Sequence, residues 1–483
     1  MKSISLKKNA ILNAIKQILK IAFPLITFPY VSRVLLEDNF GKYNFSLSII
    51  SYFQLIAGLG ISSYAIREGA RIRDDKKRFR AFADQIFTIN IVTTIIAYVA
   101  LFLTIVFWNK LHSYVCLLII QSATILFTTL GADWVNSIYE DYEYMTKRYI
   151  FVKLISLVLI FTLVKTHHDY IKYTLIIVGS EVLADILNIV YIRRYIKLKL
   201  SKRLHLKEHL APLLMLFANT LAITIYSNAD ITMLGTMQND SVVGIYSVAS
   251  KIYQIAKNLI NAVITVMIPR LAAYLGSDDI EKYDRLANKT IICNLTVTIP
   301  FSVGMFLLRK EIILLLGGSN YISGNVALAI LSFALIPASI TSVLSDGVLI
   351  TSRREKYSLI ATVESAVTNI ILNIFFIKHM SLNGAAITTL IAELIACVST
   401  FYYSKDLIKV RVQINNNSIS VIVGTFVMAA LCYFVALYFN GLAKIIISSL
   451  IGSLGYFLIL IIFKNTLALE LLNMLKKKVV KNK

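Results

Sequence analysis

The chain has 483 residues, of which 57% are apolar, and its 49 Lys and Arg residues outnumber 27 Asp and Glu residues to give a formal net charge of +22. A soluble protein of this composition would expose more apolar surface than water tolerates, so the composition excludes a soluble globular fold. The positive charge lies in short segments between apolar runs. This pattern is typical of loops beside anionic lipid headgroups and argues against a nucleic-acid-binding protein.

Apolar runs of about 20 residues follow one another along the chain, each long enough to cross roughly 30 Å of hydrocarbon as a helix. They predict about 14 membrane helices, at 10–35, 43–66, 82–108, 113–139, 149–165, 172–193, 210–236, 242–268, 288–308, 325–351, 357–378, 383–404, 417–440 and 443–463. The first run follows Lys2, Lys7 and Lys8 but ends without a small-residue cleavage site, so we interpret it as a membrane helix and not as a signal peptide.

The gaps between these runs are alternately rich and poor in basic residues. The segment before the first run and the segments after every second run hold 35 Lys and Arg residues, and the segments on the opposite side hold 8. Because basic loops stay on the cytoplasmic side, the alternation predicts a multi-pass protein with both termini in the cytoplasm.

The sequence gives little indication of an enzyme. The connections between runs are too short for a folded extramembrane domain, and there is no glycine-rich phosphate-binding loop. Four cysteines lie singly within apolar runs and are interpreted as packing residues: Cys116, Cys293, Cys397 and Cys432. We therefore expect no catalytic residues, no metal site and no cofactor.

A short motif recurs after 203 residues. Phe40-Gly41-Lys42-Tyr43 opens the second run and Val243-Gly244-Ile245-Tyr246 opens the eighth. The repeat predicts two pseudo-symmetric six-helix lobes, 1–205 and 206–410, with two appended helices and a basic tail at 411–483. Because six is even, the lobes enter the membrane in the same orientation, and we expect them to enclose a central cavity.

The eighth run carries the clearest polar pattern. Six polar residues recur at steps of four and three, which places them on one face of a helix: Ser247, Lys251, Gln254, Asn258, Asn261 and Thr265. Asn44, Ser48 and Ser51 repeat the first steps in the second run. A lysine at the centre of a lipid-facing helix costs a few kcal/mol, so this face is expected to line the cavity. The alternative is hydrogen bonding between helices, with Lys251 reaching toward one interface.

Other ionisable side chains at membrane depth are functional candidates by default. Arg33 and Lys257 are candidates for binding substrate in the cavity, and Lys153 is a further basic residue at this depth. The acids are candidates for coupling to a proton or sodium gradient: Glu181, Asp185, Asp230, Glu364 and Glu393. Structural ion pairing is the alternative for each of them. Pro24, Pro29 and Pro337 are expected to break helices and provide hinges.

Three segments resemble a known family. Phe28–Leu35 with Phe40–Phe45, Gly58–Ala70, and Asn228–Gly235 with Val243–Tyr246 are similar to segments of Wzx-type oligosaccharide flippases, in the polysaccharide transporter branch of the MOP exporter superfamily. The resemblance covers the chain nearly end to end. One departure is Leu36, where the family often has glycine.

The resemblance implies a carrier in the bacterial inner membrane that moves an undecaprenyl-diphosphate-linked oligosaccharide to the outer leaflet, for O-antigen, capsule or exopolysaccharide assembly. It also implies contacts with membrane lipids, a polysaccharide polymerase and a chain-length regulator. Two alternatives stay open, a multidrug exporter of the same superfamily and a membrane-embedded polysaccharide polymerase. A drug exporter would be expected to have an acidic cavity, and a polymerase would need an acceptor site outside the membrane.

Overall fold

Regular structure in this chain is helical. The computed structural model describes residues 6–202, 204–265, 267–277, 279–409, 416–470 and 472, and within these ranges it contains no strand. Ten helices in the described part are long and apolar enough to cross a membrane. The chain is therefore an all-α membrane protein, as its composition predicts. Arg411 and the basic tail after 472 lie outside the described residues.

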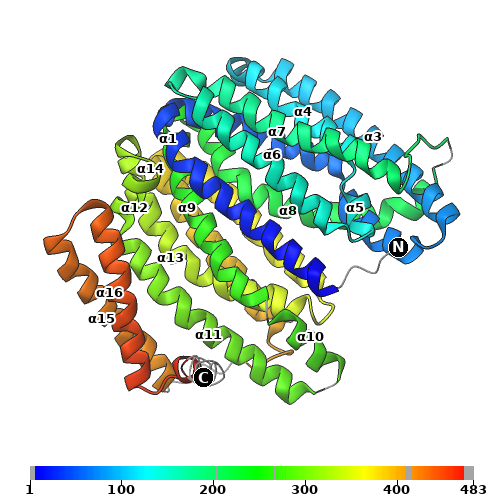
Figure 1. The fold of residues 1–483 in the computed structure, drawn as a ribbon. Coiled ribbons are helices and arrows are strands. Elements are labelled where there is room, and N and C mark those ends of the chain that lie inside the picture. Colours follow the sequence, from blue (N-terminus) through cyan, green and yellow to red (C-terminus); the bar gives the residue numbers. More distant parts are fainter. Residues whose placement is uncertain are drawn as a thin grey trace, which may run out of the picture. The chain divides into compact units, whose positions relative to one another are not determined.

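The helices fall into two compact units, and the chain passes from the first to the second between Gly244 and Ile245. In the first unit (Figure 1, blue to green), the elements are α1 Leu6–Gly58, α2 Ile61–Ile72, α3 Lys76–Phe107, η1 Asn109–Tyr114, α4 Val115–Gly131, α5 Trp134–Ile138, α6 Tyr142–Leu163, η2 His167–Asp169, α7 Tyr170–Tyr191, η3 Ile192–Arg194 and α8 Leu206–Met237. α1 packs against α3, α4, α6 and α8, so it forms the centre of this unit.

The second unit contains most of α9 Asp240–Thr265 and everything that follows it. Its other elements are α10 Ile268–Gly276, α11 Ile280–Leu307, α12 Arg309–Leu316, η4 Ser319–Gly324, α13 Asn325–Ser342, a π-helical segment Val343–Leu349, α14 Glu355–Ser404, α15 Asn416–Tyr438 and α16 Gly441–Ile462. α13 packs against α11 and α14, and α15 and α16 pack on each other (Figure 1).

The predicted lobe boundary at 205 differs from the boundary of the compact units. α8 was assigned to the second lobe from the sequence repeat, but its contacts are with α1 and α2, and it clusters with the first unit. The repeat describes how the sequence is duplicated, and the compact units describe which helices touch. The predicted lobes and the number of membrane crossings remain predictions, although each of the fourteen ranges falls largely on a helix or on half of a kinked helix.

Two long helices contain a sharp change of direction. Leu36 in α1 has φ 60° and ψ 173°, and Ser381 in α14 has φ 51° and ψ −131°. These positions separate the two predicted runs within each helix. By contrast, α1 continues through Pro24 and Pro29, and α13 continues through Pro337, with no non-helical dihedral angles there. The prolines therefore do not break the helices as expected.

The two units repeat the same local packing around α3 and α11. Asp75 caps α3 and Asp279 caps α11 through backbone N–H groups. The side-chain amides of Asn90 and Asn294 both donate to the following long helix, to Thr129 Oγ1 at 3.4 Å and to the Ser339 carbonyl at 3.0 Å. The segment after η3 is also hydrogen-bonded to α3, and the segment after α14 is hydrogen-bonded to α11. The Lys199 N–H donates to Asp84 Oδ1, and the Lys409 N–H donates to Asp284 Oδ1, both at 2.8 Å. These equivalences support an internal duplication.

The glycines of the repeated motif mark a close crossing of two backbones. A Cβ on Gly41 would lie 1.8 Å from the Asp240 carbonyl oxygen, and a Cβ on Gly244 would lie 2.0 Å from the Glu37 carbonyl oxygen. Neither position can accept a side chain unless the backbones separate. The motif found in the sequence is therefore required by the contact between α1, just after its kink, and the first turn of α9.

Candidate transport site

The polar face of α9 contains side chains without partners. Lys251 is half-buried, eleven residues after the start of the helix, and makes no hydrogen bond or ion pair with the residues that the structure describes. On the same face, the buried atoms Ser247 Oγ and Asn261 Oδ1 also have no hydrogen-bond partner among the described residues. Gln254 donates weakly to Ser250 Oγ at 3.5 Å. Groups of this kind require water or a ligand, because a buried polar group without a hydrogen bond is costly.

Lys257, predicted as a substrate-binding residue in the cavity, is ion-paired. Its Nζ donates to Glu393 Oε1 at 2.5 Å, and the Tyr253 hydroxyl donates to the same oxygen at 2.5 Å. Tyr253 and Lys257 are four residues apart on α9 and so share a face. Glu393, from the second half of α14, is only 2% exposed. Ion coupling and structural ion pairing were both possible roles for Glu393. The structure shows an ion pair, and its cation is Lys257.

Asp346 is a further acid near these residues that was not among the candidates predicted from the sequence. It lies exposed in the π-helical segment, and its charge interacts with that of Lys257. π-helical turns are uncommon and often occur at functional positions. The signal that could have identified this residue is an Asp-Gly pair near the end of the apolar run that contains Pro337.

Glu364 connects the two halves of α14. It accepts hydrogen bonds from the Ser399 hydroxyl at 2.5 Å and from the Tyr403 hydroxyl at 3.1 Å. Since α14 changes direction at Ser381, these bonds fasten the two halves to each other. This is a structural arrangement, although Glu364 was also a candidate for ion coupling.

Candidates in the first unit differ in their surroundings. Asn44 donates to the carbonyl of Phe40 in its own helix at 2.7 Å. Ser48 is buried and accepts from the Thr232 hydroxyl of α8 at 3.0 Å, so it contributes to helix packing. Arg33 is exposed near the kink of α1. Asp230 is buried on α8, close enough to Tyr52 for its charge to act on that phenol.

Glu181 and Asp185 lie together on one face of α7. The charge of Glu181 interacts with that of Lys153 on α6, and the charge of Asp185 interacts with those of Glu181, Asp133 and Arg148. Lys153 Nζ donates to Ser180 Oγ at a long 3.4 Å. The sequence therefore identified the acids of this group, and the structure adds Asp133 and Arg148.

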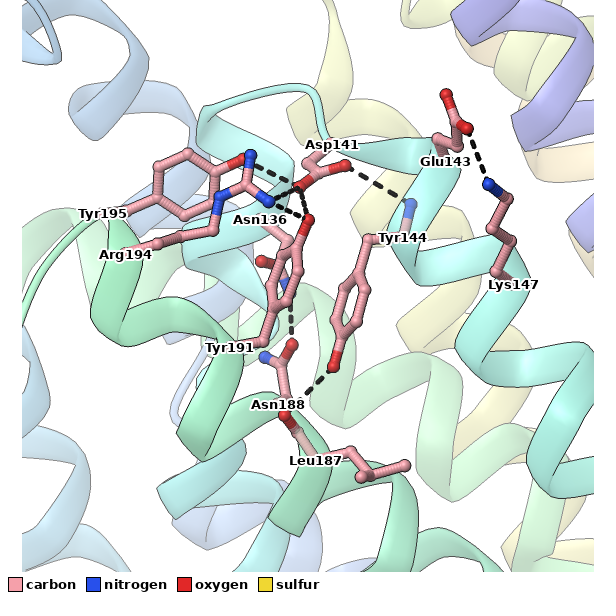
Figure 2. A network of polar contacts seen from close by, with 10 residues as sticks. All are labelled: Asn136, Asp141, Glu143, Tyr144, Lys147, Leu187, Asn188, Tyr191, Arg194 and Tyr195. Atoms are coloured by element: carbon pink, nitrogen blue, oxygen red, sulfur yellow. Dashed lines mark hydrogen bonds and ion pairs between the residues drawn. The ribbon is translucent and has the colours of Figure 1, made fainter.

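A tyrosine network surrounds Asp141 at the end of the same helices (Figure 2). Asp141 Oδ2 accepts from the hydroxyls of Tyr191 at 2.6 Å and Tyr195 at 2.7 Å, and Oδ1 accepts from the backbone N–H of Tyr144 at 3.3 Å. Arg194 lies over both tyrosine rings. Burial and the neighbouring carboxylate raise the pKa of Tyr195 well above its usual range, which keeps the hydroxyl a donor. The network joins the start of α6 to the end of α7.

These placements divide the candidates by chemistry. In the second unit Lys257 and Glu393 are brought together, whereas Lys251, Ser247 Oγ and Asn261 Oδ1 have no partner among the residues that the structure describes. In the first unit Glu181 and Asp185 are brought together beside two cations. The central cavity between predicted lobes remains a prediction.

Comparison with known proteins agrees with the resemblance. The family described as polysaccharide biosynthesis protein matches residues 6–275, and the MatE family matches residues 216–375. A protein of Escherichia coli (strain K12) that carries the name O-antigen transporter is 25% identical over 81% of this chain and 94% of its own length. The capsular polysaccharide biosynthesis protein CapF of Staphylococcus aureus is 23% identical over 78% and 93%, respectively.

Among solved structures, the lipid II flippase MurJ in an inward closed conformation is similar, with a TM-score of 0.75 and 18% identity over 96% of this chain and 99% of that one. At this identity the likeness is one of fold. The family match covers more than half of the chain, in agreement with the three resembling segments. The chain belongs to the family of polysaccharide biosynthesis proteins, as a multi-pass helical membrane protein.

Proposed function

We propose that this protein is a flippase that moves an undecaprenyl-diphosphate-linked oligosaccharide from the cytoplasmic to the outer leaflet of a bacterial inner membrane, with both of its termini in the cytoplasm. The cargo would serve O-antigen, capsule or exopolysaccharide assembly. Relatives named for O-antigen transport and capsular polysaccharide biosynthesis support this function, and so does the fold shared with a lipid II flippase. The names O-antigen transporter and lipid II flippase describe transport.

The observation that carries the proposal is the polar face of α9. Lys251 is a cation without an ion-pair partner among the described residues, deep in a helix at membrane depth. A diphosphate is a strong acceptor for an ammonium donor, and binding it would offset the cost of keeping this charge away from water. Asn261 and Ser247 have unsatisfied polar atoms on the same face, and such groups can bond sugar hydroxyls.

The direction of movement follows from the membrane potential. An inside-negative potential favours moving negative charge outward by about 2.3 kcal/mol per charge per 100 mV. A diphosphate with two charges gains roughly twice that amount. Coupling to a proton or sodium gradient would add to it, and working contacts with a polysaccharide polymerase and a chain-length regulator also belong to this proposal.

A multidrug exporter is the second candidate, because the MatE family also matches part of the chain. Cationic drugs would be attracted by an acid at the binding face. On α9 that face instead presents Lys251, while Glu393 is already occupied by Lys257 and Tyr253. A drug-resistance assay in cells that overproduce the protein separates the two candidates, and we expect no change in resistance.

The function is tested by locating the lipid-linked oligosaccharide in cells with and without the protein. Depletion should leave its synthesis intact and make it accumulate in the cytoplasmic leaflet, where sugar-specific reagents added outside cannot reach it. Re-expression should restore access. An unchanged distribution between leaflets on depletion would exclude the flippase function.

A further inference from the structure

Basic side chains from two separate segments gather at the start of α3, on the predicted cytoplasmic side. The non-helical segment 195–201, after η3, is fastened to this helix, because the Lys199 N–H donates to Asp84 Oδ1 and the Ser201 N–H donates to Thr88 Oγ1, both at 2.8 Å. Six exposed cations lie on the first turns of α3 and on this segment, and we name them the α3 basic platform: Lys76, Lys77, Arg78, Arg80, Lys197 and Lys199.

The positive charge of the platform is not balanced by the residues that the structure describes. None of its six side chains makes an ion pair or hydrogen bond within the described ranges. Residues 74–84 and 195–201 together hold six basic and three acidic side chains, which leaves an excess of three positive charges. The first turn of α3 contains no acid, although acids are favoured there by the helix dipole. The cations are thus kept at a position where they cost local stability.

The second unit has an equivalent surface with a different charge. The capping aspartates of α3 and α11 align the two helices residue by residue. In this alignment two cations of the platform are replaced by acids, because Glu281 corresponds to Lys77 and Asp284 corresponds to Arg80. The internal duplication therefore preserved the packing of the two helices and changed the charge of their first turns.

The cations at the start of α11 are also engaged within the second unit. Each of three basic side chains has an acidic partner, whereas the corresponding side chains of α3 have none in the described part of the chain. The pairs are Lys282–Asp279 at 2.7 Å, Arg285–Glu281 at 2.9 Å and Lys289–Glu470 at 2.6 Å. A general need for basic cytoplasmic segments does not explain this difference, since it applies to both units alike.

The platform lies where α3 leaves the hydrocarbon. α3 has 32 residues and is about 48 Å long at 1.5 Å per residue, whereas the hydrocarbon core is about 30 Å thick. Counted from the outer end at Phe107, the spanning part begins near Thr88, so the earlier turns lie at headgroup level and beyond. Leu200, between the two residues that bond Asp84 and Thr88, is 66% exposed at this boundary. An exposed leucine beside lysines is typical of a membrane interface and favours a lipid as partner.

We propose that the α3 basic platform binds the headgroups of anionic phospholipids in the leaflet on the predicted cytoplasmic side. Its ammonium and guanidinium groups donate to the lipid phosphate, while Leu200 contacts the acyl chains below it. One basic side chain near an anionic membrane surface corresponds to about a fivefold preference for the anionic lipid. This inference goes beyond the proposed function, because binding at this surface does not depend on the cargo.

Trp134 provides a reporter inside the first unit. It lies in the same buried apolar cluster as Phe79 of α3, and Leu198, between two lysines of the platform, packs against that cluster. The chain has two tryptophans, so Trp108→Phe leaves Trp134 as the only one. The full-length Trp108→Phe protein is placed in phosphatidylcholine vesicles. Energy transfer from Trp134 to pyrene-labelled phosphatidylglycerol is then compared with transfer to pyrene-labelled phosphatidylcholine.

We expect half-maximal transfer at a mole fraction of labelled phosphatidylglycerol that is at least about fivefold lower than for labelled phosphatidylcholine. Combined Arg80→Gln, Lys197→Gln and Lys199→Gln should reduce this preference to less than about twofold. The matched control removes the same number of cations from the second unit and should keep the preference. It combines Lys282→Gln, Arg285→Gln and Lys289→Gln. Unfolding temperatures of both triple variants establish that they are folded.

Four results would overturn the proposal. The first is equal transfer to both lipids in the Trp108→Phe protein, and the second is an undiminished preference after the platform cations are removed. The third is an equal loss in the second-unit control, which would assign the effect to net charge. Inorganic phosphate should compete no better than sodium chloride of the same ionic strength, since both only screen a lipid site. Selective displacement by phosphate is the fourth result, because the platform would then bind a free anion.

Discussion

Single residues at membrane depth differ in whether their charge is already satisfied. Glu393 accepts two short hydrogen bonds, from Lys257 and Tyr253, whereas Lys251 donates none to the described residues. Satisfied charges hold the fold in place, and a charge left open is available to a cargo group. The two lysines of α9 are thus expected to respond differently to the same substitution, although they are only six residues apart.

Replacement of Lys251 should affect transport more than stability. Lys251→Gln removes the cation but leaves a neutral amide that is easier to bury, so we expect a loss of about tenfold or more in flipping rate with near-normal abundance. Lys251→Arg should keep part of the activity. Transport and protein levels measured in parallel check this, and full activity of Lys251→Gln at normal abundance would contradict cargo binding.

Replacement at the Lys257–Glu393 pair should affect stability. Glu393 is 2% exposed, and Lys257→Met leaves its buried carboxylate without the ammonium, which typically costs about 3 to 5 kcal/mol. The double variant Lys257→Met, Glu393→Gln removes both charges and should recover most of that loss. Thermal unfolding of the purified variants measures the coupling. Equal and additive losses would show that the pair does not act as a unit.

At the scale of the helix, the kink in α1 gives a physical reason for glycine at position 36, where this chain has Leu36. Leu36, where related sequences often have glycine, is the residue with φ 60° and ψ 173° in α1. This region is almost restricted to glycine, and other residues there store about 1 to 3 kcal/mol of strain. The kink is therefore present without the residue that favours it.

Glycine at this kink should be tolerated. In Leu36→Gly the relief of backbone strain should offset the lost side-chain contacts, so the unfolding temperature should be no lower than that of the wild type. The neighbouring Leu35 is fully buried, and Leu35→Gly should lower stability by at least about 3 kcal/mol because it also creates a cavity. A drop of the same size in both variants would show that the strain at Leu36 is not significant.

Much of the element order could be predicted from the sequence, since apolar runs of sufficient length in lipid can only become helices. The positions of the kinks were harder to predict from the sequence. Prolines were expected to break helices, yet the non-helical dihedral angles lie at Leu36 and Ser381, where backbone conformation depends on tertiary contacts. The partner of Glu393 was also not predictable, because helical spacing places both Lys251 and Lys257 at membrane depth. Choosing between them needs the contact between α9 and α14.

For the whole molecule, the asymmetry of basic residues predicts orientation. Reporter fusions after Lys207, Tyr283, Lys356 and Lys483 should be cytoplasmic, and fusions after Asn109 and Asn239 should be external, because basic segments are retained inside. Enzymatic reporters that are active on only one side of the membrane measure this. An external C-terminus would refute the prediction that both termini are cytoplasmic.

The central claim is that the protein itself moves a lipid-linked sugar between leaflets. It is tested most directly with purified protein in liposomes whose undecaprenyl-diphosphate-linked oligosaccharide starts in one leaflet, by following its exposure to a sugar-cleaving enzyme added on the other side. The account predicts that the protected pool becomes cleavable at a rate proportional to the amount of protein, with no change in sugar chain length. A rate equal to that of protein-free liposomes, or lengthening of the sugar chain by the protein, would contradict it.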